Sequence, residues 1–145
     1  MMATMFILCF HACKTQEKST GANIPDQVDQ ALVEKYWKLI ELQGKPVVVN
    51  DSNAKEAHII LKKDDNRFNG FAGCNRITGS YRTKRSAGIV FSQTVSTRMT
   101  CLNMDTETQF LQVLETADSY AVRNDTLVLS KAGVPLARFV VVYLK

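Results

Sequence analysis

The sequence predicts an α+β domain, mostly antiparallel β, in which a curled sheet or incomplete barrel of about eight short strands carries one main helix. From Tyr36 onward, apolar and polar residues alternate with a period of two, which is the pattern of strands with one buried face. One stretch, at about 105–117, has apolar residues at helical spacing instead. The last stretch, 136–144, is apolar on both faces, so we expect it to lie centrally in the sheet.

Length and composition limit the class of protein. A chain of 145 residues is the size of one domain, and 46% hydrophobic with 22% charged residues is ordinary for a soluble globular domain. The net charge of +4 is modest, and its basic residues are scattered except for the cluster Arg82–Arg85. Because no basic stripe is interleaved with aromatic residues, we expect no nucleic-acid partner. No apolar run approaches the ~18 residues of a membrane-spanning helix, and we expect a monomer without a cofactor.

The N-terminus has the composition of an export signal. Residues 1–12 carry no Lys, Arg, Asp or Glu and hold a short apolar run, after which the chain becomes abruptly polar. Ala12-Cys13 at this junction resembles a bacterial lipobox, in which the cysteine becomes the lipidated first residue of the mature chain. The stretch departs from that pattern in lacking a basic residue near its start and in having His11 two positions before the cysteine. The alternative is an untargeted N-terminus with chance cysteines.

These features divide the chain into three parts. We expect a signal peptide at 1–12, a lipid-anchored flexible tether at 13–34 with a short helix near 26–34, and a folded domain at 35–145. The lipid on Cys13 would hold the domain to a membrane through its buried methylene groups. The expected location is the bacterial cell envelope, facing the periplasm or the cell surface.

Strands are predicted wherever period-two alternation lies between clusters of turn residues. Gln43–Pro46, Asp64–Asn66, Arg123–Asp125 and Lys131–Gly133 are such clusters. The strands so predicted are 36–42, 47–49, 57–62, 67–71, 77–83, 88–91, 94–98, 119–122, 126–130 and 136–144.

A helix interrupts this pattern at about 105–117. Asp105 and Glu107 stand in its first turn, where acidic residues complement the helix dipole. Asn103 or Asp105 is the expected N-cap. The apolar residues at helical spacing are Phe110, Leu111, Leu114 and Ala117.

Two short stretches, Gly70–Arg76 and Ser96–Cys101, each contain a cysteine and an arginine. In order and spacing, these stretches resemble the paired signature of the META domain, the HslJ-like envelope proteins, over about residues 35–144. The resemblance implies a small β-rich envelope domain linked to stress response or antibiotic tolerance, in a family with no agreed biochemical activity. Its other matching pieces are Trp37–Leu39, Gly79–Tyr81 and Phe110–Leu111.

Cys74 and Cys101 are the only cysteines outside the leader. In an exported protein two cysteines indicate a disulfide, and the alternatives are two buried free thiols or a metal or redox role. A zinc site needs four ligands, a thiol nucleophile needs an activating base, and His58 is the one imidazole outside the leader. His58 lies in mid-strand on the same face as Ile60, which is more typical of a surface or packed histidine.

A candidate binding surface combines the two signature stretches. Gly73 or Asn75 is expected to need a positive φ, with the Asn75 side chain bonded to loop backbone. If the cysteines approach, Arg76 and Arg98 converge and suit an anion or a partner's carboxylate. The alternative is that both arginines bond local carbonyls or the acids Asp105 and Glu107. The candidate surface is Gly73, Asn75, Arg76, Thr97 and Arg98, with no catalytic and no metal-binding residue.

We therefore expect a non-enzymatic envelope lipoprotein module that binds an envelope protein or a small ligand. The first alternative is a thiol-dependent enzyme that uses Cys74 or Cys101 with His58, which requires an exposed thiolate. The second alternative is a peptidase inhibitor or secretion-assembly protein that binds through a sheet edge.

Overall fold

The computed structural model describes residues 29–48, 55–101 and 104–143. The predicted signal peptide, the lipidation site Cys13 and most of the predicted tether lie outside these ranges. The sheet and helix predicted from the sequence lie within them and are described next.

Within these described ranges, nine strands and one helix follow one another. The strands are β1 (Trp37–Leu42), β2 (Lys45–Pro46), β3 (His58–Leu61), β4 (Arg67–Phe71), β5 (Arg76–Lys84), β6 (Gly88–Ser96), β7 (Ser119–Arg123), β8 (Thr126–Lys131) and β9 (Val134–Val141), and the helix α1 (Asp105–Thr116) connects β6 to β7. The predicted α+β class is confirmed.

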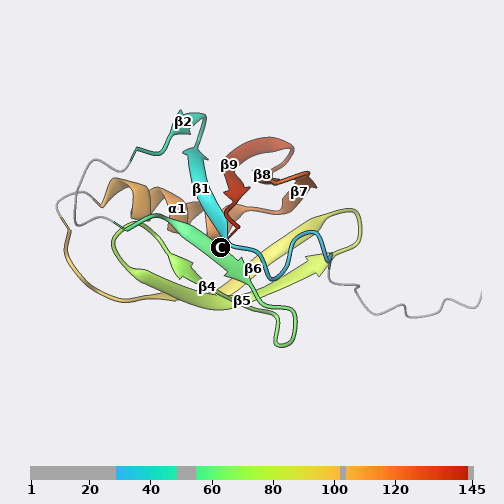
Figure 1. Ribbon diagram of the computed structural model, residues 1–145, viewed down its shortest axis with the longest axis horizontal. Helices are drawn as coiled ribbons and strands as arrows, with labels where there is room; N and C mark the ends of the chain where they lie inside the picture. Colours follow the sequence, from blue (N-terminus) through green and yellow to red (C-terminus); the bar gives the residue numbers. More distant parts are fainter. Residues whose placement is uncertain (1–28, 49–54, 102–103, 144–145) are drawn as a thin grey trace, which may run out of the picture.

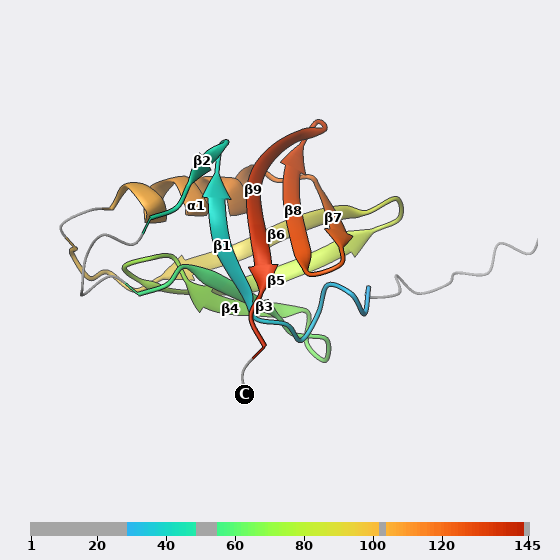
Figure 2. The same ribbon diagram turned by 45° about the horizontal axis from the view of Figure 1, so that its top comes forward.

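The strands form one antiparallel sheet that curls back on itself. Their order is β2-β1-β3-β4-β5-β6-β7-β8-β9, and a further pairing joins β1 to β9. The curl is nearly open between β6 and β7, which pair only at Gly88 and Ser119. Figures 1 and 2 show β1, β9, β8 and β7 crossing over β4, β5 and β6, with α1 along one side of this stack. β9 lies between β8 and β1, which confirms its predicted central place.

Two predicted strand boundaries are wrong for local reasons. Residues 47 and 48 are not in a strand; the hairpin turn occupies only Gln43 and Gly44, which both have positive φ, so Lys45–Pro46 pairs with β1 instead. The predicted strands 88–91 and 94–98 are one strand, β6. Gln93 at its centre has a φ of 53°, and the register with β5 shifts there, because a bulge absorbs one extra residue without ending the strand.

The helix ends one residue earlier than predicted, and its cap differs. Met104 occupies the N-cap position and makes no side-chain capping hydrogen bond. Asp105 is the first helical residue, and Asn103 lies outside the described residues. Since Asp105 and Glu107 are both in the first turn, the predicted complement to the helix dipole is present without a side-chain cap.

The segment before β1 packs on the domain. The sequence predicts tether and a short helix up to residue 34, but residues 30–34 form turns and bends. Asp29 accepts from the backbone of Ala31 and Leu32, and Glu34 has a φ of 56°, which ends the turn. Leu32 is fully buried, and its carbonyl accepts the indole N–H of Trp37 at 2.7 Å. The packed domain therefore includes this segment.

The core lies inside the curl, where alternate strand residues meet the apolar face of α1. Phe110 of the helix packs against Phe139 of β9, with ring centroids 5.7 Å apart. Phe68 of β4 meets Phe91 of β6 edge-on at 5.3 Å. The largest side chains with less than 2% exposure are Trp37, Phe68, Phe110 and Phe139. Because Trp37 is the only tryptophan, its fluorescence reports on this core.

Gly79→Ala is expected to destabilise the domain by about 1–3 kcal/mol. A Cβ at Gly79 would lie 2.6 Å from Phe68 Cε1 and 2.8 Å from the carbonyl oxygen of Ser92, so the packed ring and a neighbouring strand would have to shift. Urea unfolding followed by Trp37 fluorescence measures the change. Ser80→Ala, which faces outward on the same strand and loses one 3.2 Å hydrogen bond, is the control. Equal midpoints for both variants would contradict the prediction.

The domain is expected to lose stability as the pH rises from 10 to about 12. Burial is the largest cause that raises the pKa of Tyr36, Tyr81 and Tyr120 from 10.0 to about 12. The folded state thus favours the neutral phenol, so this contribution is complete below pH 10 and is lost as the phenols ionise. Tyrosinate absorbance and Trp37 fluorescence should change together above pH 10. Ionisation of all tyrosines near pH 10 in a protein that stays folded would contradict this.

Candidate functional site

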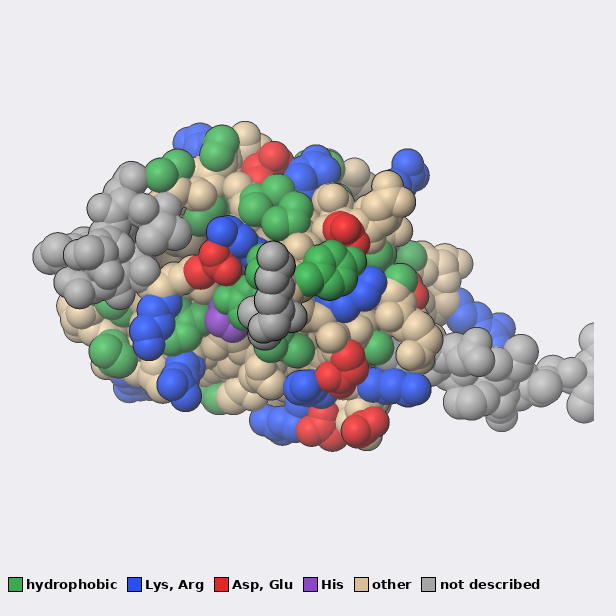
Figure 3. Space-filling view, in the orientation of Figure 1, with side chains coloured by type: hydrophobic (Ala, Val, Ile, Leu, Met, Phe, Trp, Pro, Cys, Tyr) green, Lys and Arg blue, Asp and Glu red, His purple; other side chains and the backbone are tan. Residues whose placement is uncertain are grey.

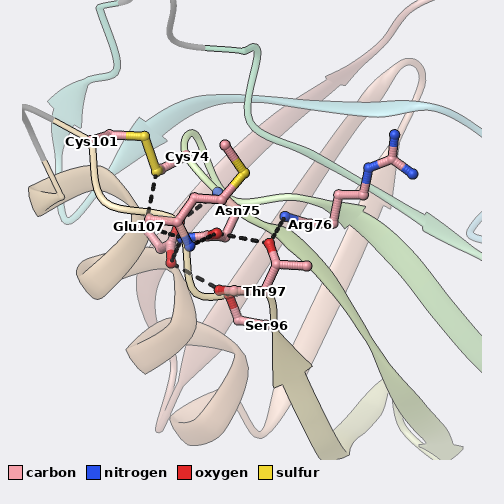
Figure 4. Close-up of a disulfide and its surroundings, with 8 residues drawn as sticks. Cys74, Asn75, Arg76, Ser96, Thr97, Cys101 and Glu107 are labelled. Carbon is pink, nitrogen blue, oxygen red and sulfur yellow. Dashed lines mark hydrogen bonds between the residues drawn. A yellow bond between two sulfur atoms is a disulfide. The ribbon is translucent and has the colours of Figure 1, made fainter.

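The two signature stretches meet at a disulfide. Cys74 follows β4 and Cys101 precedes α1, and their sulfurs are bonded, with Cα atoms 6.0 Å apart. The bond confirms the predicted pairing. It ties the turn between β4 and β5 to the segment that leads from β6 into the helix, as Figure 4 shows. Cys74 is 5% exposed, whereas Cys101 is partly exposed, so the bond is shielded from solvent on the Cys74 side.

Asn75 is the centre of the hydrogen bonds around this link (Figure 4). Its side-chain oxygen accepts from the hydroxyl of Thr97 at 2.7 Å and from the backbone N–H of Met99 at 2.8 Å. Its side-chain nitrogen donates to the carbonyl of Met99 at 3.0 Å and to Glu107 Oε1 at 2.9 Å. The amide thus uses its full bonding capacity, which confirms that Asn75 binds loop backbone.

Glu107 anchors the same network from the helix. Its side chain is 5% exposed. Oε2 accepts from the backbone N–H of Asn75 at 2.7 Å, and Oε1 accepts from the Asn75 side chain and from the Ser96 hydroxyl at 3.4 Å. Buried polar groups need such partners. Glu107 therefore fixes the position of α1 relative to both signature stretches.

The turn before Asn75 depends on glycine. Gly73 has a φ of 108°, a conformation that L side chains rarely adopt, whereas Asn75 is not among the positive-φ residues in the described ranges. The backbone N–H of Ala72 donates to the carbonyl of Asn75 at 2.8 Å and closes the turn. Of the two predicted positions, Gly73 is the correct one.

The arginines are placed differently from the prediction. Glu107 bonds Asn75 and Ser96, not Arg76 or Arg98. Arg76 lines one cavity, on the outer face of β3–β6, while Arg98 lines another, between β6 and α1. The Arg76 side chain points away from the disulfide in Figure 4. Neither guanidinium forms a hydrogen bond or ion pair with a described residue, and the structure does not join the two arginines in one anion site.

These two cavities are grooves that flank the segment 95–97. The first, about 620 Å³, lies on the outer face of the sheet; the second, about 530 Å³, lies between the end of β6 and the start of α1. Val95, Ser96 and Thr97 border both. Residues 95–100, which we call the recognition segment, thus form a ridge between two grooves. Val95 is 59% and Met99 is 64% exposed on this ridge.

His58 lies apart from the disulfide, on the outer face of β3. Its ring stacks on Tyr36 with centroids 4.2 Å apart, and its Nδ1 donates to the carbonyl of Glu56 at 2.9 Å. The predicted mid-strand position is wrong, because His58 is the first residue of β3; the expected shared face with Ile60 and the packed surroundings are found. Within the described ranges no cluster of three His, Cys, Asp or Glu side chains could hold a metal ion, and no helix there is long and apolar enough to span a membrane.

Three residues of these sites did not emerge from the sequence as site residues: Glu107, Lys55 and Phe71. Glu107 had a signal, since it shares the helical stripe of Phe110 and Leu114; an acid on an apolar stripe indicates a buried, hydrogen-bonded carboxyl. No sequence pattern identifies Lys55 or Phe71 as a residue of a groove, because only the pairing of the strands brings them together.

Three solved structures share the fold. An NMR structure of a protein from Burkholderia xenovorans is 23% identical with a TM-score of 0.63, and the match covers 89% of this chain and 99% of that one. A second NMR structure is 20% identical with a TM-score of 0.59 over 75% and 91% of the two chains. The crystal structure of a DUF4847 family protein from Bacteroides vulgatus is 14% identical with a TM-score of 0.54 over 75% and 93%. No curated protein matches the chain.

The family model of the META domain matches residues 30–142. This range begins before the predicted start at 35 and includes the buried Leu32, in agreement with the packing of the segment before β1. It also contains both signature stretches and the disulfide between them. The chain belongs to the META domain family.

Proposed function

We propose that this chain is a non-enzymatic binding module of the bacterial cell envelope, anchored by a lipid on Cys13, whose recognition segment contacts an envelope partner. One observation carries the proposal. The recognition segment is held by a disulfide and by three hydrogen bonds to the Asn75 side chain, yet Val95 and Met99 remain more than half exposed. A segment already held in one conformation loses less entropy on binding, so the exposed apolar side chains on it suit contact with a partner.

The compartment proposal has separate support. Disulfides persist in oxidising compartments such as the periplasm and are rare in the cytosol, and Cys74–Cys101 is such a bond. The stress-related role rests on the META resemblance. None of the matched descriptions names a reaction, which favours binding over catalysis.

The anchor is tested by the intact mass of protein purified from its native membrane. An acylated chain that begins at Cys13, and that alkylates only after reduction, is the expected result. An unprocessed chain with Cys74 and Cys101 free would contradict both the anchor and the compartment.

The binding surface is tested by a photo-crosslinking residue in place of Met99, in native cells. Val134, at the turn into β9, is 62% exposed and serves as the matched control position. We expect a crosslinked protein from position 99 and none from position 134. No product from position 99, or the same products from both positions, would overturn the proposed surface.

The thiol-enzyme alternative has no support in the structure, because both sulfurs are in the disulfide and His58 stacks on Tyr36. The sheet-edge alternative has one supporting observation. β6 pairs with β7 at a single residue pair, so beyond Gly88 its outer edge has no strand partner in the described part of the chain. A partner strand added there would lie in the groove beside α1.

A further inference from the structure

Among the residues that the structure describes, the groove on the outer face of the sheet is lined by two cations, Lys55 and Arg76, and by no acid. Its volume of about 620 Å³ is within the range of small-ligand sites. Its lining residues include Lys55, His58, Phe71, Arg76 and Val95, and none of them is Asp or Glu. Figure 3 shows basic and hydrophobic side chains together to the left of the purple histidine, with acidic side chains above it and at the lower right.

No described acid neutralises the cations of this groove. Glu56 directly follows Lys55 in the chain, but its carboxylate pairs with Lys38. Lys55 and Arg76 make no ion pair within the described residues. Lys55 Nζ instead lies 5.3 Å from the ring centroid of Phe71, a cation–π contact. Two positive groups that line one groove raise the local concentration of anions.

Apart from the exposed side chain of Asn69, the rest of the described lining is apolar or already takes part in hydrogen bonds. Phe71 and Val95 offer apolar surface, and Val95 is 59% exposed. The hydroxyl of Thr78 donates to the carbonyl of Phe68 at 3.0 Å, and the hydroxyl of Thr97 donates to Asn75. Charge from Lys55 and Arg76, together with contact to Phe71 and Val95, therefore dominates what the groove can select.

We propose that this groove binds small organic anions in which a carboxylate or phosphate is joined to a hydrophobic group. Arg76 and Lys55 bind the anionic group through charge-assisted hydrogen bonds, and Phe71 and Val95 contact the hydrophobic group. The inference deepens the proposed function and rests on it in one respect: the groove shares Val95 and Thr97 with the recognition segment.

The test is a titration of the oxidised full chain, followed by two-dimensional amide NMR spectra. The probes are phenylbutyrate, its neutral isostere phenylbutyramide, and inorganic phosphate. Phenylbutyrate should shift the amides of Phe71, Thr78 and Val95. Arg76→Gln should weaken its affinity by about tenfold, the effect of one charged hydrogen bond. Arg82→Gln is the control, because Arg82 is an exposed arginine on the outer face of the same strand but does not line the groove.

The titration has several outcomes that would contradict the proposed ligand class, and they can be told apart. Equal binding of phenylbutyramide, equal losses in both arginine variants, or no shifts at all would overturn the inference. Phosphate binding as tightly as phenylbutyrate would overturn the hydrophobic half of the ligand class. Shifts with phosphatidylglycerol vesicles but not with phenylbutyrate would replace a soluble ligand by a membrane surface. If the crosslinks from position 99 persist without anion binding, the proposed function stands and this inference fails.

Discussion

Replacing Cys74 and Cys101 together by alanine is expected to lower the free energy of unfolding by about 3.6 kcal/mol. The two cysteines are 27 residues apart, and cross-linking a loop of that size removes conformational entropy from the unfolded chain. Urea unfolding followed by Trp37 fluorescence measures the loss. Because native domains are stable by only about 5–15 kcal/mol, this loss is between about a quarter and three quarters of the total stability.

The controls separate the effect of losing the disulfide from the effect of replacing the two side chains. Reduction of the wild-type protein should produce nearly the same loss as the double replacement, and reduction should leave the variant unchanged. Thiol titration of the unfolded, unreduced protein counts the bond directly, since neither Cys74 nor Cys101 should react before reduction. Because the chain also contains Cys9 and Cys13, the labelled residues are identified by peptide mass. Labelling of Cys74 or Cys101 before reduction, or a reduced protein as stable as the oxidised one, would contradict the prediction.

The alternation of apolar residues was sufficient to predict most of the strands and the faces of a regular one such as β5. In β5, Ile77, Gly79 and Tyr81 face the core and Thr78 and Ser80 face outward, as the period of two requires. The pattern could not reveal that β6 is continuous. A bulge at Gln93 adds one residue to the strand, so the positions that face the core before the bulge and after it follow different alternations. A break in alternation is the same in sequence whether the strand ends or bulges.

The disulfide was predictable and the grooves were not, for one physical reason. The predicted export signal and lipidation account for Cys9 and Cys13, which leaves Cys74 and Cys101 as each other's partners, so their pairing could be predicted without knowledge of the fold. The anion groove brings together Lys55 before β3, Phe71 at the end of β4 and Arg76 at the start of β5. Which side chains face one another across strands depends on register, and register follows from the pairing of the whole sheet.

Glu107→Ala is expected to destabilise the domain by roughly 3 kcal/mol, because two buried donors lose their acceptor at about 1–3 kcal/mol each. Those donors are the backbone N–H and the side-chain nitrogen of Asn75, at 2.7 and 2.9 Å from the carboxyl oxygens. Urea unfolding measures the loss. Glu115→Ala, at an exposed position of the same helix, is the control and should change stability by less than about 0.5 kcal/mol.

Glu107→Gln refines this experiment. Glutamine keeps one acceptor oxygen but presents an N–H₂ group to the second donor. The free energy of unfolding of the glutamine variant should therefore lie between those of the alanine variant and the wild type. The disulfide and Glu107 hold the same turn to the same segment, since Cys74 and Asn75 are adjacent. Their removals should therefore not be additive: once the disulfide is absent, the turn is free to move and Glu107→Ala should cost less. Equal effects of Glu107→Ala with and without the disulfide would show that the two links act on independent parts of the fold.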